Sequence, residues 1–547
     1  MGQILRKKKG AAMTELRKND LYEAEIDGFS SDGGGVCRIG GRAVFVPRAL
    51  PGETWRVRIV KANRTAVWGR GEERLVSSPH RVEPRCPVFG RCGGCACMHM
   101  DYETELAFKR GRVDDALRRI GGLALRTDAI LGADRTEGYR NKAIYNFGPG
   151  PVCGFFRARS HDVISVARCL LQPKSFQRAA NALLRWMRDV GVPAYDERTG
   201  EGLVRHLFLR AGTEGFAACI VAADAIPGGA ADALRRACPE LTGVSLCVND
   251  RPGNTVLTGD IRPLWGPSGV EQTLCGARFD LSPLTFFQVN TAQAERLYAL
   301  AGEYAAPEGK VVLDLYGGAG TIGQSVARSA RRLIGSDIVP SAVENARKNA
   351  EKNGLTNAEY ICGDASAVAR QLADSGLRPD VIITDPPRKG MDEDVLRSIA
   401  AMGPDTLVYV SCDPGTLARD LRRLAALGFT AEKCTAVDMF PRTAHVETVV
   451  QLSQQKASTH IKVDLDLDEL DRTSAEAKAT YQEIQEYVLK THGLKVSNLY
   501  ISQVKRKCGL EMGTNYNLPK SENSRVPQCP PEKEAAIMDA LRHFQMI

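Results

Sequence analysis

Two side chains suited to chemistry stand at the ends of neighbouring apolar runs in the second half of the chain. Asp385 ends DVIITD within a DPP motif, and Cys412 follows DTLVYVS within SCDP. Ligands of open α/β sheets bind outside the carboxyl ends of the strands, so both side chains are expected at one ligand site. A cysteine is most often a small buried apolar residue, but the position of Cys412 at a strand end, beside Asp413 and Pro414, favours a chemical role.

A glycine turn precedes both positions. VVLDLYGGAGTIG places Gly318, Gly320 and Gly323 between an apolar strand and a helix, where the backbone can approach a nucleotide cofactor. Asp337 ends the next strand and can accept hydrogen bonds from a ribose diol. The spacing also satisfies the GxGxxG pattern of NAD sites, so the turn alone leaves hydride transfer open. A hydride enzyme needs no thiol at this rim, and Cys412 therefore favours methyl transfer to a pyrimidine carbon.

Methyl transfer to carbon 5 of uracil needs a thiolate and a base. Thiolate addition to carbon 6 makes an enolate that attacks the methyl donor, and a base then removes the hydrogen from carbon 5 so that the thiol is eliminated. Cys412 fits the first role, and Glu447 in HVETVV fits the second. A solvated carboxylate is the plain alternative for Glu447, and His445 is interpreted as a neighbour that orients loops. Methylation of an amine nitrogen is disfavoured. Enzymes of that kind have an aromatic residue after DPP to stack on the substrate, and here Arg388 and Lys389 follow DPP instead.

A second candidate site is a cluster of cysteines near residue 90. Cys86, Cys92 and Cys95 form C-x5-C-x2-C, and the glycines of CGGC let the backbone wrap closely around a metal centre. The chain has 16 cysteines and no export signal, which indicates thiols kept reduced. Three thiolates need a fourth ligand: Cys97 is nearest, and Cys169 could be brought in by folding. The spacing leaves zinc and an iron–sulfur cluster equally open.

The pattern of apolar and turn residues predicts a multidomain α/β protein. Strands alternate with helices from about residue 285, which predicts a doubly wound parallel sheet. The predicted segments are a basic tail (1–19), a small OB-like β-barrel (20–78), the cysteine segment with a helix (79–124), a mostly antiparallel α+β domain with one or two helices (125–270), a Rossmann-like cofactor domain (271–453), and a linker with a small, mostly helical appendage (454–547). The helix after the cysteines should bury a face formed by Leu106, Val113, Leu117 and Ile120.

Composition and charge indicate a protein that contacts a polyanion. The chain has 547 residues, of which 43% are apolar and 25% charged, as in folded domains. Residues 1–100 hold 18 basic and 10 acidic residues, an excess equal to the net charge of +8. This asymmetry favours nucleic acid over a merely solvated tail. The basic residues of the barrel that could follow a nucleic-acid backbone are Arg42, Arg48, Arg56, Arg58, Lys61 and Arg64. No apolar run of about 18 residues predicts a membrane span, and a cytoplasmic protein is expected.

Together these motifs resemble the uracil-C5 RNA methyltransferases, in particular the bacterial 23S rRNA enzymes of the RlmD/RumA type. The motifs that carry the resemblance, over roughly residues 20–453, are CGGC, YRNK, FFQVN, LDLYGGAGTIG, DPPRKG, YVSCDPGTLARDL and DMFPRTAHVET. The resemblance implies a TRAM barrel, a [4Fe-4S] cluster, a central RNA-binding domain and a class I S-adenosyl-L-methionine domain. It implies methylation of a single-stranded or looped uridine in 23S rRNA, with no obligate protein partner. A tRNA enzyme and a noncatalytic RNA-binding protein with a retained cofactor fold are the alternatives.

The resemblance also implies a role for each candidate residue. Cys412 would be the nucleophile and Glu447 the base. The cluster ligands would be Cys86, Cys92, Cys95 and Cys169. The cofactor contacts would be Gln288, Tyr316, Thr321, Asp337, Asp364 and Asp385. The chain departs from the family at Asp413, often Asn, and at Arg442, often His. The negative charge of Asp413 is expected to shift the pKa of the neighbouring thiol.

The last segment lies outside the resemblance to the catalytic core. Residues 456–547 hold 13 basic and 13 acidic residues, so this part has no net preference for a polyanion. Two helices are expected, over 480–493 and 496–509, joined at Gly493 with Ser497 as a cap. The segment also holds a basic cluster at residues 505–507. A folded appendage without a specific ligand is favoured over a helix-turn-helix contact with RNA or protein.

Overall fold

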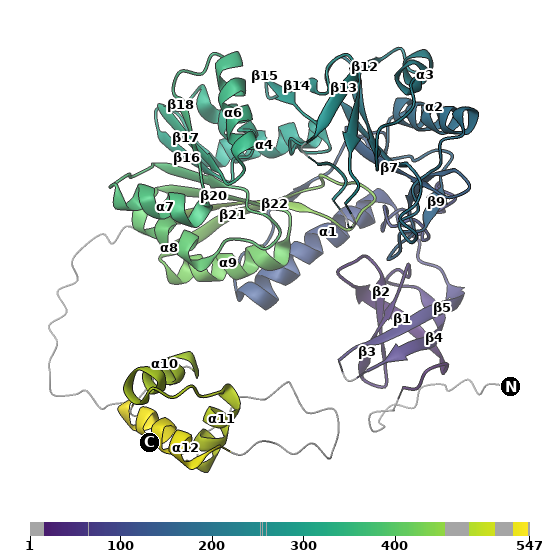
Figure 1. The fold of residues 1–547 in the computed structure, drawn as a ribbon. Helices are drawn as coiled ribbons and strands as arrows, with labels where there is room; N and C mark the ends of the chain where they lie inside the picture. Colours follow the sequence, from purple (N-terminus) through teal and green to yellow (C-terminus); the bar gives the residue numbers. More distant parts are fainter. Residues whose placement is uncertain are drawn as a thin grey trace. The chain divides into compact units, whose positions relative to one another are not determined.

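The computed structural model of the protein describes residues 16–63, 65–251, 253, 255–258, 260–454, 481–508 and 529–544. The chain divides into two compact units, Met1–Lys456 and Ala457–Ile547. The first unit contains a barrel, a seven-stranded sheet and an eight-stranded sheet with helices (Figure 1). This architecture agrees with the predicted multidomain α/β class.

Five strands close the N-terminal barrel, as predicted. In barrel order they are β1 (Leu21–Phe29), β2 (Gly35–Ile39), β3 (Arg42–Val46), β5 (Val67–Val76) and β4 (Thr54–Ala62). Alternate side chains fill the interior, where Val44 and Val57 are fully buried. Leu16 packs into the same core, and the Asn19 N–H donates to the Ile59 carbonyl. Residues 16–19 therefore belong to the barrel and not to the predicted tail, whose residues 1–15 lie outside the described part.

Some of the barrel's basic residues are paired within the barrel. Arg56 forms ion pairs with Glu23 and Glu73, and Arg58 pairs with Glu72. Exposed pairs of this kind contribute about 0–1 kcal/mol, so a phosphate group can displace the carboxylates. Arg64 lies outside the described residues. Contact between the barrel and nucleic acid stays a prediction.

The helix after the cysteines buries a shorter face than predicted. Helix α1 (Tyr102–Ala116) begins at Asp101, whose carboxylate accepts a bond of 2.7 Å from the Thr104 N–H. It continues into a π-helical turn, η1 (Leu117–Gly121). A π turn inserts an extra residue and rotates the residues that follow. Leu117 is buried, but Ile120 is 46% exposed, so the predicted apolar face ends before Ile120.

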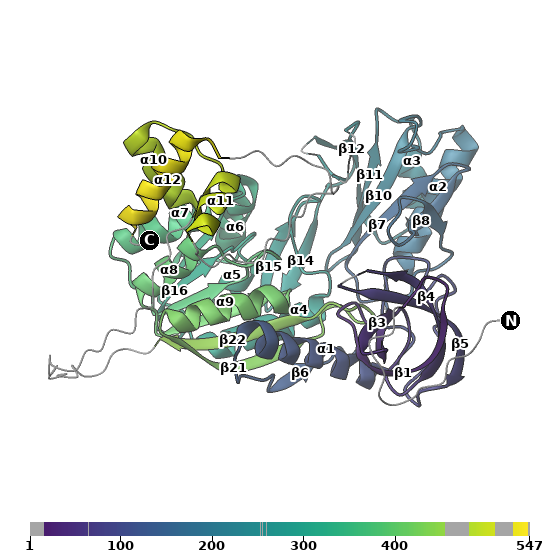
Figure 2. The same cartoon turned by 90° about the horizontal axis from the view of Figure 1, so that it is seen from below.

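The central domain is a mostly antiparallel sheet with two helices, in agreement with the predicted pattern. Its strand order is β13 (Ile261–Trp265), β12 (Leu241–Val248), β11 (Phe216–Ala222), β10 (Val204–Ala211), β7 (Lys142–Gly148), β8 (Val152–Phe156) and β9 (Val163–Ser165). Only β11 and β12 pair in parallel among these strands. Helices α2 (Lys174–Val190) and α3 (Ala230–Ala237) cover one face (Figure 2). A two-stranded ribbon, β14 (Val270–Leu274) and β15 (Ala277–Leu281), follows.

The large sheet has the predicted parallel centre. Its strand order is β18 (Ala358–Cys362), β17 (Arg332–Asp337), β16 (Val311–Leu315), β19 (Val381–Thr384), β20 (Thr406–Ser411), β22 (Glu447–Gln454), β21 (Phe429–Val437) and β6 (Ala129–Leu131). The helices of this part are α4 (Thr291–Ala305), α5 (Thr321–Ala327), α6 (Pro340–Lys352), α7 (Ala365–Asp374), α8 (Glu393–Met402) and α9 (Pro414–Ala426). Strand β6 pairs in parallel with β21, although the sequence assigned its residues to the segment 125–270. Three residues are too few to show a period from which this partner could be predicted.

In the described parts of the second unit, 481–508 and 529–544, three helices pack around an apolar core. The helices are α10 (Tyr481–His492), α11 (Asn498–Lys507) and α12 (Pro531–His543). Ser497 caps α11, as predicted, by accepting from the Tyr500 N–H. Helix α12 was not predicted. Of the basic residues 505–507, Lys505 is only 7% exposed and Lys507 pairs with Glu534.

Candidate active site

All eight residues predicted for catalysis and cofactor binding line one cavity of about 1260 Å³. They are Gln288, Tyr316, Thr321, Asp337, Asp364, Asp385, Cys412 and Glu447. The cavity lies at the carboxyl ends of β16, β17, β19 and β20. Parallel strands bring their carboxyl ends to one edge of a sheet, which explains why residues far apart in the sequence meet here.

The glycine turn is held in an unusual backbone conformation at the cavity wall. Tyr316 has a φ of 64° and Gly318 a φ of 56°, in the left-handed region. That conformation costs a residue with a side chain roughly 1–2 kcal/mol. The Gly318 N–H donates to Asp337 Oδ2 at 3.0 Å, and the Val339 N–H donates to Asp337 Oδ1 at 2.8 Å. These two bonds fix the carboxylate that was predicted to meet a ribose.

The other predicted cofactor residues have structural partners as well. Asp364 caps α7 by accepting from the Ser366 N–H at 3.0 Å, and the Thr321 hydroxyl lies 3.1 Å from that of Tyr298. The Gln288 carbonyl accepts a bond of 2.8 Å from Asn141 Nδ2. Asn141 belongs to the YRNK motif, for which the sequence suggested no individual contact.

Cys412 and Glu447 face each other across two antiparallel strands. Ser411 at the end of β20 pairs with Thr448 in β22, so the next position on each strand holds Cys412 and Glu447. The Glu447 side chain is almost fully buried, with the residue 2% exposed, and its Oε2 has no hydrogen-bond partner among the described residues. A thiol and an unpaired carboxylate therefore stand side by side in the cavity wall.

Burial and mutual repulsion shift the acidity of this group of residues. Burial raises the pKa of Glu447 to about 8, with a further increase from Asp385 and a decrease from Arg388. Burial also raises the pKa of Asp385 to about 7. The pKa of Cys412 rises to about 11, first through burial and then through the charges of Glu447 and Asp385. A carboxyl that titrates near neutral pH is suited to take up and release a proton in catalysis.

Asp413 was expected to shift the pKa of the Cys412 thiol, but in the structure its side chain caps a helix. Asp413 is the N-cap of α9, and its Oδ1 accepts from the Gly415 and Thr416 N–H groups at 2.9 Å each. The largest electrostatic contributions to the pKa of Cys412 come from Glu447 and Asp385 instead. The side chain of Asp413 turns to the helix because an N-cap carboxylate satisfies N–H groups that otherwise lack partners.

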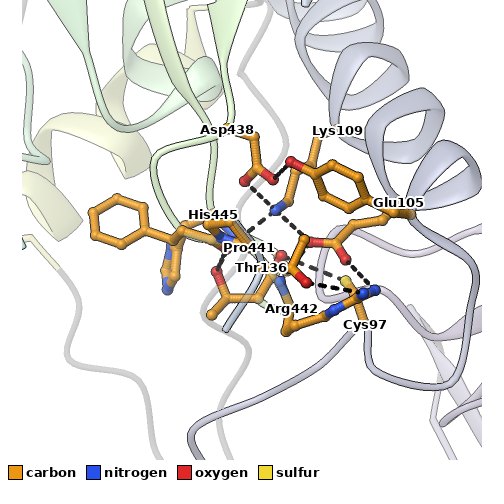
Figure 3. Close-up of polar contacts among 12 residues, drawn as sticks. Cys97, Glu105, Lys109, Thr136, Asp438, Pro441, Arg442 and His445 are labelled. Atoms are coloured by element: carbon orange, nitrogen blue, oxygen red, sulfur yellow. Dashed lines mark hydrogen bonds and ion pairs between the residues drawn. The ribbon is translucent and has the colours of Figure 1, made fainter. Parts of the chain in front are cut away.

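The loop that leads into Glu447 is held from outside over most of its length. Seven consecutive carbonyls, from Asp438 to Ala444, each accept a hydrogen bond from another segment of the first unit. In the order of the accepting carbonyls, from Asp438 to Ala444, the donors are Gln293, Asn290, Lys109, Tyr139, the Ala96 and Cys97 N–H groups together, the Cys97 thiol and Arg112. Figure 3 shows the centre of this network, where Lys109 and Arg442 lie among Glu105, Asp438 and Cys97.

The four predicted cluster cysteines line a second, small cavity of about 70 Å³. Cys86, Cys92, Cys95 and Cys169 share it with the side chain of Arg140. Cys97, the alternative fourth ligand, is not in its wall, and its Sγ donates to the Thr443 carbonyl at 3.4 Å. Burial raises the pKa of Cys92 and Cys169, and the positive charge of Arg140 opposes this rise. Within the described residues, no three His, Cys, Asp or Glu side chains form a group that could hold a metal ion.

Among the described residues, no helix combines the length and the apolar character that crossing a bilayer requires.

Comparison with known proteins identifies the family. A family profile described as tRNA (Uracil-5-)-methyltransferase matches residues 277–455. Two curated proteins named as uncharacterised RNA methyltransferases align over 447 residues, 80% of this chain and 98% of each relative: one of Halalkalibacterium halodurans is 37% identical and one of Listeria innocua is 39% identical. The solved tRNA (uracil-54, C5)-methyltransferase of Pyrococcus abyssi, a complex with S-adenosyl-L-homocysteine, has a TM-score of 0.66 at 26% identity and covers 79% of this chain and 100% of that one. This chain therefore belongs to the RNA uracil-C5 methyltransferase family, of the RlmD/RumA type, which uses S-adenosylmethionine.

Proposed function

We propose that the protein methylates carbon 5 of a uridine in 23S rRNA through a covalent bond between Cys412 and carbon 6 of the base. One observation carries this proposal. A single cavity contains the six candidate cofactor contacts together with the adjacent thiol and carboxylate. S-adenosylmethionine, when bound there by Gln288, Tyr316 and Asp337, would supply an electrophilic methyl group.

The residues of the chain account for every other step. The Cys412 thiolate adds to carbon 6, and the electron pair of the ring double bond moves toward carbon 5 and the carbonyl. Carbon 5 then forms the new bond to the methyl group. The Glu447 carboxylate removes the hydrogen from carbon 5, and the bond between sulfur and carbon 6 breaks, which restores the thiolate and leaves Glu447 protonated. Arg388 lines the same cavity and favours the anionic thiol.

The bound uridine must leave its stack to reach Cys412. Unstacking costs a few kcal/mol and is least costly in single-stranded or looped RNA. This supports a loop as the target.

We further propose that the four cysteines hold a [4Fe-4S] cluster, which does not require them to surround a single ion. The thiols line one cavity, and Arg140 supplies a positive charge beside them. Zinc–sulfur bonds of about 2.3 Å would bring four thiolates within about 4 Å of one another, whereas a four-iron cluster binds each thiolate through a different iron and leaves them farther apart. Iron and sulfide analysis of anaerobically purified protein tests this. Stoichiometric zinc without sulfide would overturn it.

The choice between 23S rRNA and tRNA rests on the barrel and the cysteine cluster, which resemble the ribosomal enzymes. The tRNA enzyme of Pyrococcus abyssi aligns with 79% of this chain, so assays must decide. Purified protein would be given 23S rRNA and total tRNA with labelled methyl donor. Label in the tRNA alone would contradict the ribosomal substrate and leave the chemistry intact.

The covalent step is tested with a substrate that cannot finish the reaction. RNA carrying 5-fluorouridine has no removable hydrogen on carbon 5, so the wild type should form a stable adduct through Cys412. Cys412→Ala should form none. Glu447→Gln should accumulate the adduct on ordinary uridine, because base removal of the hydrogen is blocked. Methylation by Cys412→Ala, or an adduct through another residue, would refute the mechanism.

A further inference from the structure

The central sheet carries two positive charges directly opposite each other on adjacent strands. Lys142 in β7 pairs with Arg210 in β10 in the antiparallel register. Residues opposite each other share one face and lie about 4.5–5.5 Å apart at Cβ, and like charges there are destabilising. The neighbours Ala143 and Leu209 point to the other face, into the core beneath α2 and α3. Lys142 and Arg210 therefore share the face that these helices leave uncovered (Figure 2).

Neither charge has an acidic partner in the described part of the chain. Arg210 is 4% exposed, and its Nε is shut off from solvent without an acceptor. Its Cζ lies 5.5 Å from the centre of the Phe208 ring. Burial, and then the charges of Arg210 and Arg140, lower the pKa of Lys142 to about 8, and burial lowers that of Arg210 to about 10. Buried cations without a counter-charge are costly, and such groups are normally paired.

This pair lies close to the active cavity. Arg210 lines a small crevice with Gly269 and Leu281, and both of these residues also line the large cavity. Asn141, next to Lys142, donates to the carbonyl of Gln288 in the cavity wall. A group bound between Lys142 and Arg210 would thus sit close to the wall of the large cavity.

We propose that Lys142 and Arg210 form a binding site for a phosphodiester group of the RNA backbone next to the target uridine. A guanidinium presents paired N–H donors to phosphate oxygens, and an ammonium adds a point charge. The phosphate would supply the negative charge that the protein lacks here. This inference rests on the proposed RNA substrate and adds a specific contact to it.

Three variants that each remove one positive charge test the proposal. Lys142→Gln and Arg210→Gln change the site, and Arg236→Gln on the exposed side of α3 is the matched control. RNA affinity is measured over a range of salt concentrations. Each site variant should weaken binding about tenfold, and the slope of log K against log[salt] should fall by about 0.7, the value for one lost contact with single-stranded RNA. The control should change neither quantity.

Two further measurements separate this site from a structural role and from other anions. Removing a charge that has no partner should leave the free energy of unfolding unchanged or raise it, whereas removing a structural residue would lower it. Affinity for S-adenosylmethionine, which carries a carboxylate, should stay constant. Methylphosphonate linkages, which are neutral, would be placed in the RNA one at a time. A linkage at one position beside the uridine should weaken RNA binding by the wild type. The same linkage should cause no additional loss of RNA affinity in the site variants.

The outcomes distinguish the inference from the function on which it rests. The phosphate site would be overturned if both site variants had the same salt slope as Arg236→Gln. It would also be overturned if no methylphosphonate position weakened RNA binding by the wild type. Weaker S-adenosylmethionine binding with unchanged RNA binding would assign the charges to the cofactor and also overturn it. A wild type that binds no RNA would instead refute the proposed function.

Discussion

Lys109→Met tests how the loop before Glu447 is held. The Lys109 side chain is fully buried, and its Nζ donates to Glu105 at 2.7 Å, to Asp438 at 2.5 Å and to the Phe440 carbonyl at 3.1 Å (Figure 3). Its three N–H donors are thus all used. Methionine has a similar length but no charge, so the variant leaves two carboxylates buried without their shared cation.

The expected loss of stability follows from the remaining partners. Removing one member of a buried ion pair costs about 3–5 kcal/mol, because the other charge stays buried. Arg442 still lies 3.3 Å from Glu105, and Tyr102 still donates to Asp438 at 2.7 Å. We therefore expect the lower end, about 3 kcal/mol at pH 8.

The loss should shrink in acid. Burial raises the pKa of Glu105, and the charge of Lys109 opposes this rise, so the variant raises the pKa further. A carboxyl with a higher pKa in the folded than in the unfolded state binds the additional proton when folded, and stability falls as pH increases between the two values. Lys109→Met should accordingly lose less stability at pH 5 than at pH 8.

Urea unfolding followed by tryptophan fluorescence measures this effect. All four tryptophans belong to the first unit, so the signal reports on the part that contains Lys109. Arg118→Met is the control, because Arg118 is exposed and pairs only with Asp115, and it should cost less than about 1 kcal/mol. A loss below 1 kcal/mol for Lys109→Met at pH 8, or equal losses at both pH values, would refute the reasoning.

Three other predictions concern the active site and the second unit. Because burial raises the pKa of Cys412 to about 11, its thiolate fraction and the rate of 5-fluorouridine adduct formation should increase about tenfold per pH unit between pH 7 and 9, and a rate independent of pH would contradict this. Asp337→Asn should weaken S-adenosylmethionine binding about tenfold in calorimetry, since an amide keeps only one of the two oxygens that accept the Gly318 and Val339 N–H groups. Deleting residues 457–547, which hold a separate core, should leave the methylation rate and the chosen uridine unchanged, and a new modification site would show that this unit selects RNA.

The sequence could predict that the candidate residues meet in one cavity, whereas their chemical roles remain predictions. Apolar runs marked the strands, and each of Asp337, Asp385 and Cys412 stands at the end of one, so a parallel sheet brings them together. Glycine spacing marked the turn at residue 318. These signals are local in sequence, and the topology then follows from the alternation of strands and helices.

Other contacts had no local signal. Lys109 meets Asp438 across 329 positions, and a lysine at spacing four from Glu105 is typical of an exposed helix pair rather than a buried one. Strand β6 is too short to show a pattern, and Arg442 has a φ of 70°, which its residue type does not indicate. The sequence also left Cys97 and Cys169 open as the fourth cysteine, because only the folded chain shows that Cys97 reaches Thr443.

The position of Glu447 therefore depends on residues that never touch the reacting atoms. Its Oε2 is buried without a partner, and an unsatisfied buried acceptor costs about 1–3 kcal/mol. The backbone at Glu447 is held by its pairing with Val437 in β21 and by the pairing of the adjacent Thr448 with Ser411 in β20. The eight hydrogen bonds to the preceding loop contribute about 1 kcal/mol each and fix the chain at the point where β22 begins. The donors come from the cysteine segment, α1, the YRNK motif and the start of α4, so four separate parts of the first unit hold the chain that leads into Glu447.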